Sequence, residues 1–221
     1  MAFAATTNPV VASLAGGRDT ELADLGFFYV GVSPTIGTGN IGTASVQAFT
    51  ETTPILILYN AGTLNVYPMY WKLHCTVVGA TAATIATMFT FTLDTGNRYS
   101  SAGTILTLSN TNMASTNTSA STIYSGAPIA TAASGTRRVV AHAAMEGVGV
   151  APVHHTHTFT WGNTAHSPHT VLIDNTTTIA HNARTLSPMV IGPNQSMVVV
   201  RWSPAITTAP TYEHEFGFVE K

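Results

Sequence analysis

Hydrophobic and polar residues alternate with a period of two over much of this chain, which is the pattern of β-strands with one buried face. The longest such run covers residues 64–78, where Lys72 and His74 fall on the polar face. The opposite face is apolar and carries Tyr67, Met69, Trp71, Leu73, Cys75 and Val77. Because Pro68 has no N–H to donate to a neighbouring strand, we expect this strand to start at a sheet edge or to carry a β-bulge there.

Shorter runs of β-branched and aromatic residues predict further strands. They cover residues 27–32, 55–59, 86–93, 104–108, 137–142, 153–161, 169–174, 196–202 and 213–219. A helix is indicated only over residues 19–25, where acidic residues suit the N-terminus of one or two turns. About ten strands separated by turn-rich segments predict an all-β fold, either a sandwich or a barrel.

Two segments lack this patterning. Residues 1–20 are small and mostly uncharged, and we expect an extended N-terminal arm that becomes ordered on contact with another subunit. Residues 109–136 carry no charged side chain and are rich in Ser, Thr, Asn and Ala. Connections of this length are uncommon in a compact domain and usually functional when they are ordered. We therefore expect a surface excursion that packs on a neighbour, within a single β domain spanning residues 21–221.

The composition limits the classes of partner. The chain has 221 residues, enough to bury a sizeable core, but only 8% of them are charged, against about a quarter in an average protein. Eight basic and ten acidic side chains do not make the clustered positive surface that nucleic acids need, so we expect no nucleic-acid partner. No run reaches the roughly 18 apolar residues of a membrane helix, and we expect no membrane contact. Because interface cores are depleted of charge, the composition favours a homo-oligomer.

The histidine pair His155 and His157 is the strongest candidate for chemistry. Two histidines at i and i+2 share a strand face and can both reach one metal ion. With Gly149, the pair resembles the opening of the first cupin motif, which implies a metal-dependent enzyme or binding protein. That motif needs a glutamate four or five residues after the second histidine, where this chain has Trp161 and Gly162. We therefore expect a pair of partly buried structural histidines and no metal site.

Other motifs give no catalytic or cofactor-binding residue. Gly37, Gly39 and Gly42 match the spacing G-x-G-x-x-G, but a strand pattern follows where a dinucleotide site needs a helix, so we expect a glycine-rich loop. The nucleophile motif G-x-S-x-G does not occur. Cys75, the single cysteine, cannot form an internal disulfide and is expected to be a small core residue.

The last third of the chain carries a family resemblance. Residues 191–204 form a tight turn that leads into a strong strand, and residues 213–219 form a closing strand. Together they resemble the late strands of viral jelly rolls. The scarcity of charge, the abundance of Thr and Ala, the apolar arm and the long uncharged segment are similar to virion proteins of tailed bacteriophages, particularly head decoration or cement proteins. The resemblance implies a single jelly-roll-like β-sandwich and a homotrimer that contacts a major capsid protein or neighbouring virion subunits.

We therefore expect a structural protein of the virion, not an enzyme, that stabilises the shell through contacts between subunits. One alternative is a cupin-like metal-dependent enzyme or binding protein that uses His155 and His157. Another is a carbohydrate-binding β-sandwich in which Trp161, Trp202 and Tyr212 supply aromatic stacking surfaces.

Overall fold

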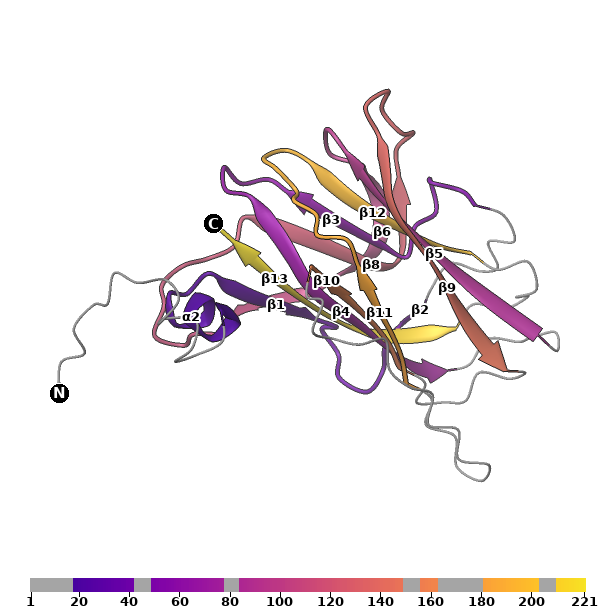
Figure 1. The fold of residues 1–221 in the computed structure, drawn as a ribbon, viewed down its shortest axis with the longest axis horizontal. Helices are drawn as coiled ribbons and strands as arrows, with labels where there is room; N and C mark the ends of the chain where they lie inside the picture. The colour runs from indigo at the N-terminus through magenta and orange to yellow at the C-terminus, as the bar shows by residue number, and fades with distance from the viewer. Residues whose placement is uncertain (1–17, 42–48, 78–83, 149–155, 163–180, 203–209) are drawn as a thin grey trace.

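The chain folds into two β-sheets packed face to face (Figure 1). The computed structural model describes residues 18–41, 49–77, 84–148, 156–162, 181–202 and 210–221. Within these ranges the one helix is α2 (Arg18–Asp24), which lies close to the helix predicted at residues 19–25. The expected all-β sandwich is confirmed. The strand predicted at residues 169–174, and residues 1–17 of the expected arm, lie outside the described residues.

The first sheet has seven strands in the order β11-β10-β4-β13-β1-β7, with β2 paired to β13. Neighbouring strands are antiparallel, except that β10 and β11 are parallel. The strands are β1 (Phe28–Val32), β2 (Asn40–Ile41), β4 (Val66–Val77), β7 (Thr107–Asn110), β10 (Thr156–Trp161), β11 (His181–Leu186) and β13 (Thr211–Glu220).

The second sheet has six strands in the order β6-β8-β3-β12-β5-β9, antiparallel throughout. They are β3 (Leu56–Asn60), β5 (Thr84–Asp94), β6 (Tyr99–Ile105), β8 (Ser121–Ala130), β9 (Arg138–Val148) and β12 (Ser196–Trp202). Residues 104–108, predicted as one strand, are divided between β6 and β7 by the buried Leu106.

Aromatic side chains fill the space between the sheets. Trp71 of β4 stacks on Phe159 of β10 with ring centroids 5.4 Å apart, and it meets Phe91 of β5 edge-on at 6.2 Å. Such offset and edge-to-face pairs contribute beyond the burial of apolar area. Cys75 lies in this core as expected, and burial raises the pKa of its thiol. Other large side chains with no exposure here are Phe89, Phe216, Phe218, Leu56, Leu58 and Leu73.

Strand β4 carries the β-bulge that Pro68 predicts. The register of β13 against β4 shifts at this point, so that Met69 is an extra residue. Because successive residues of a strand point to opposite faces, the shift directs Tyr67 and Met69 toward helix α2 instead of the core. The bulge is thus confirmed, but the prediction that Tyr67 and Met69 share the core face with Trp71 is wrong.

The uncharged segment 109–136 contains a central strand, so the prediction of a surface excursion is wrong for much of it. Residues 121–130 form β8, which lies between β3 and β6. Its first inward side chains are Ser121, Ile123 and Ser125, all of them buried. Because two of these three are serines, the strand lacks the hydropathy alternation that marks the others. The absence of charge in this strand reflects burial.

The paired strands β6 and β8 bend over the outer face of the second sheet. Gly103 and Gly126 have positive φ angles of 75° and 84° where the pairing of these strands is irregular. Beyond this bend, Ala130 packs with Ile57 and Val198, which point away from the main core. The bent strand pair thereby creates a second, smaller core on the outside of the sandwich.

Candidate functional site

His157 lies inside the sandwich. It is on the inward face of β10 and only 6% exposed, with its ring 5.7 Å from that of Phe89 and 6.3 Å from that of Tyr212. His155 lies outside the described residues. Over the part of the chain that the structure describes, no group of three or more His, Cys, Asp or Glu side chains is placed to hold a metal ion.

Trp161, Trp202 and Tyr212 do not form one aromatic surface. Trp161 and Tyr212 are 3% and 4% exposed and belong to the main core. Trp202 instead packs in the small outer core, where its Nε1–H donates a hydrogen bond to Thr90 Oγ1 at 3.3 Å. A sugar-binding platform needs exposed ring faces, so the structure does not bring these three side chains together for that purpose.

A polar concavity of about 320 Å³ lies over β4 and β13 on the outer face of the first sheet. Its charged groups already have partners. Lys72 Nζ lies 2.8 Å from Glu215 Oε1, and Glu213 accepts a hydrogen bond from the N–H of Gly37. Burial acts to raise the pKa of Glu215, but hydrogen bonds from Lys72 and Tyr70 outweigh it and lower that pKa. Glu215 is therefore not poised as a general acid.

His214 forms part of the lining of this concavity and is a poor general base. It is 2% exposed, and neither of its ring nitrogens has a hydrogen-bond partner. Burial lowers its pKa to about 3, so the imidazole is neutral at physiological pH and holds a proton weakly. Its ring lies 5.9 Å from that of Trp71. His214 lies on the same inward side of β13 as Phe216.

A second cavity lies where α2 meets the ends of β4, β10 and β13, and we call it the α2 cavity. Its volume is about 470 Å³, within the usual size range of small-ligand sites. Trp161 forms part of its wall, and the indole Nε1 of this residue has no hydrogen-bond partner. The other apolar wall residues are Leu22, Met69, Pro188, Met189 and Val219. These residues come from distant parts of the sequence, so no local pattern predicts the cavity.

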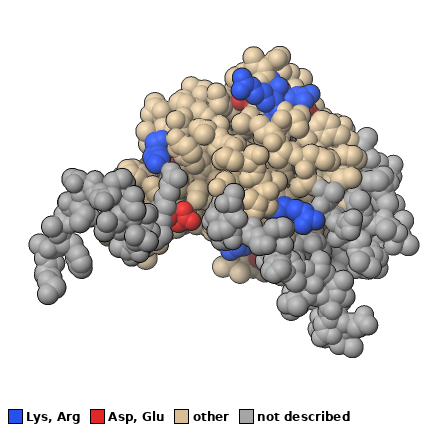
Figure 2. Space-filling model, in the orientation of Figure 1, with Lys and Arg blue, Asp and Glu red and all other residues tan. Residues whose placement is uncertain are grey.

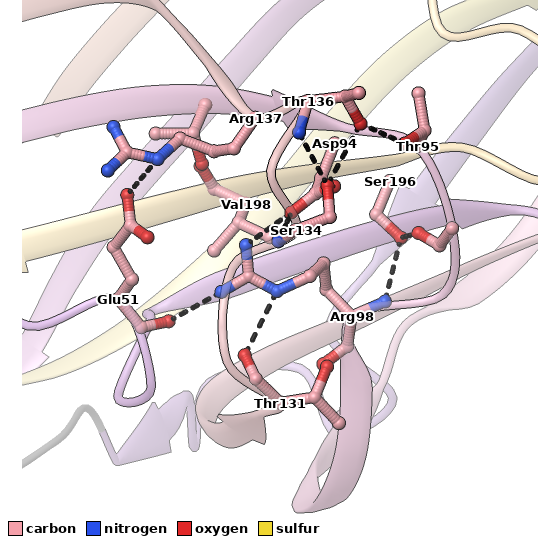
Figure 3. Close-up of polar contacts among 12 residues, drawn as sticks. Glu51, Asp94, Thr95, Arg98, Thr131, Ser134, Thr136, Arg137, Ser196 and Val198 are labelled. Atoms are coloured by element: carbon pink, nitrogen blue, oxygen red, sulfur yellow. Dashed lines mark hydrogen bonds and ion pairs between the residues drawn. The ribbon is translucent and has the colours of Figure 1, made fainter.

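A buried polar network joins the segment that follows β8 to the end of β5 (Figure 3). Arg98 Nη1 lies 2.8 Å from Asp94 Oδ2, and the two side chains are 3% and 1% exposed. The N–H of Ser134 donates to the same carboxylate at 3.0 Å, and Arg98 Nε donates to the carbonyl of Thr131 at 3.0 Å. Glu51 and Arg137 form a second ion pair beside it at 3.0 Å. These contacts have a structural role, because they fasten residues 131–137 across the end of β5.

The surface has little charge (Figure 2). On the side shown, Lys, Arg, Asp and Glu occupy small separate areas of a mostly uncharged described surface. Apolar side chains are exposed at both edges of the second sheet, where Ile105 of β6 is 56% and Val139 of β9 is 51% exposed.

Comparison with known proteins identifies no relative of this chain, because no protein-family model, curated protein or solved structure matches it. In the described ranges, no helix has both the length and the apolar character needed to cross a membrane. What the protein does must be inferred from its own residues.

Proposed function

We propose that this chain is a structural protein of a virus particle, of the head decoration or cement kind, which acts by joining and covering shell subunits rather than by catalysis. The observation that carries the proposal is the way in which the fold uses its few charges. Asp94 and Arg98 neutralise each other inside the molecule, and Arg201 and Glu220 are also buried. What remains is a surface with little charge to keep copies apart.

The edge strand β6 supports an intersubunit role. It forms one edge of the second sheet, and residues 99–105 contain no charged side chain. Most of this strand is exposed. Soluble proteins usually protect such an edge with lysines, prolines or a covering segment, because its free N–H and C=O groups pair readily with another strand. An exposed edge without a charged side chain fits a protein whose edges are covered in an assembly.

The finer features of the proposal follow from the resemblance to viral coat folds. The two-sheet sandwich is compatible with a jelly-roll-like arrangement, and we assign the protein a homotrimeric state with a major capsid protein or another virion subunit as its partner. Exposed apolar side chains at both edges of the second sheet suit cyclic contacts, in which one edge of a copy meets a different surface of the next.

Two measurements on the native material test the proposal. Light scattering of the purified protein should give the mass of three chains of 23.2 kDa each. Mass spectrometry of purified virions should detect the chain at a fixed ratio to the major capsid protein, and electron cryo-microscopy should place its density on the shell. A monomer in solution that is also missing from purified particles would contradict the proposal.

A further inference from the structure

The α2 cavity suits a segment of chain that carries apolar side chains. Its walls are mainly apolar, and they include the side chains of Leu22, Met69 and Met189, with Asp19 and Lys221 as the charged wall residues. Trp161 contributes ring surface to the same wall. Covering apolar wall surface with apolar side chains removes both from water, which favours binding of such a segment.

The chain contains a segment with these properties immediately before α2. Residues 1–17 have no charged side chain, and Phe3, Val10, Val11 and Leu14 are distributed along them. This segment joins α2 at Arg18, next to Asp19, which is itself part of the cavity lining. Asp19, Thr20 and Glu21 are exposed, so the helix begins at the surface of the domain.

We propose that the α2 cavity binds the N-terminal residues 1–17 of a second copy of this chain. The inference rests on the proposed function, because it names the contact by which copies join. An extended segment of 17 residues reaches at most roughly 56–61 Å, well beyond the radius of gyration of about 17 Å expected for a domain of this length. Each copy can therefore give its arm to a neighbour and accept an arm from another, which is a closed exchange.

A mixing experiment separates exchange between copies from insertion of the arm into its own cavity. The first variant lacks residues 2–17 and keeps the cavity. The second keeps the arm and carries Met69→Glu, which places a charge on the half-buried cavity wall. A third variant keeps the arm and carries Pro188→Asp in place of Met69→Glu. Because Pro188 is an exposed wall residue, this variant tests the cavity even if Met69→Glu does not fold. Val190→Asp is the matched control, since Val190 is 45% exposed but is not part of the wall.

We expect each variant alone to associate at least about tenfold more weakly than the wild type, which corresponds to about 1.4 kcal/mol. The mixture should form a complex containing one chain of each kind, detected by native mass spectrometry through their different masses. Val190→Asp should behave like the wild type. In the mixed complex, the indole ¹H–¹⁵N resonance of Trp161, assigned with Trp161→Phe, should shift as the arm packs against the wall to which Trp161 belongs.

The outcomes of these experiments distinguish an error in the arm-exchange inference from an error in the proposed function. If the wild type oligomerises and is present in virions, but the two variants form no mixed complex, arm exchange is wrong and the structural role stands. If the wild type is monomeric and missing from virions, the proposed function itself is wrong. Circular dichroism on each variant confirms that the sandwich is folded before either conclusion is drawn.

Discussion

Replacing Arg98 with alanine should destabilise the protein by about 3–5 kcal/mol, because it leaves the Asp94 carboxylate buried without its cation. The two side chains are 3% and 1% exposed, and their ion-pair distance is 2.8 Å. Arg98 also donates to two backbone carbonyls, those of Thr131 at 3.0 Å and Glu51 at 3.5 Å. The substitution therefore removes the cation that pairs with the buried Asp94 and leaves further acceptors unsatisfied (Figure 3).

The same molecule supplies a matched control. Lys72 and Glu215 form an ion pair with the same distance of 2.8 Å, but their side chains are 45% and 38% exposed. Exposed pairs contribute about 0–1 kcal/mol, so Lys72→Ala should cost no more than that. Two ion pairs of equal length should thus differ several-fold in their effect on the free energy of unfolding, and the difference should follow their burial.

Urea unfolding monitored by circular dichroism measures both variants. In thermal unfolding of a chain of this length, a loss of 1 kcal/mol in the free energy of unfolding lowers Tm by about 2–4 °C, so Arg98→Ala should lower Tm by about 6–20 °C. Hydrogen bonds from Ser134 and Arg98 outweigh the effect of burial and lower the pKa of Asp94. Its contribution is therefore present above the unfolded pKa of about 3.9 and lost as the pH falls through the folded value. A cost for Arg98→Ala equal to that of Lys72→Ala would refute the reasoning.

Four other outcomes are expected. Because the pKa of His214 is about 3 in the folded protein, the unfolded state binds a proton there that the folded state does not, and the free energy of unfolding should fall as the pH drops from about 6.5 toward 3. In the His214→Phe variant this part of the pH dependence should be lost, which unfolding experiments at a series of acidic pH values measure. Gly217→Ala should cost about 1–3 kcal/mol in urea unfolding, since a Cβ there would overlap the ring of Tyr70. Gly135→Ala should be neutral, because a Cβ at Gly135 would point into open space. Elemental analysis should find less than one transition-metal ion per chain, and one ion lost in a His155→Ala/His157→Ala variant would favour the cupin-like alternative. Sedimentation at low and high salt should show association that changes little, because few charges are available for screening.

The sequence predicts those strands whose inward positions are large and apolar. Strands β3, β5, β12 and β13 have Phe, Leu, Ile or Val on the core face, and their predicted ranges match the observed ones closely. Pro68 predicts the bulge in β4 because a proline has no backbone N–H to donate to a neighbouring strand in any structural context. Such features need no knowledge of the rest of the chain.

The features that escaped prediction depend on tertiary contacts. Strand β8 buries Ser121 and Ser125. The Oγ–H of Ser125 donates to the carbonyl of Thr104 at 3.1 Å, a bond that forms only once β6 lies beside β8, whereas Ser121 Oγ has no hydrogen-bond partner in the described structure. The pair Asp94 and Arg98 is enclosed by Glu51, Thr131 and Ser134, which come from distant parts of the chain. The α2 cavity is likewise formed by segments that meet only in the folded molecule. The sequence therefore indicates Trp161 as an aromatic candidate but does not predict the residues that surround it.

The buried polar groups of this protein are of two kinds, and the difference bears on its stability. Asp94 and Arg98 are partnered within the fold, and their contacts fasten residues 131–137 across the end of β5. The indole Nε1 of Trp161 and the ring nitrogens of His214 have no hydrogen-bond partner in the described structure. A buried polar group without a partner costs about 1–3 kcal/mol, and folded proteins keep few of them. Because these atoms are inaccessible in the folded chain, the aromatic core around them must offset this cost, and the contact proposed at the α2 cavity depends instead on its apolar walls.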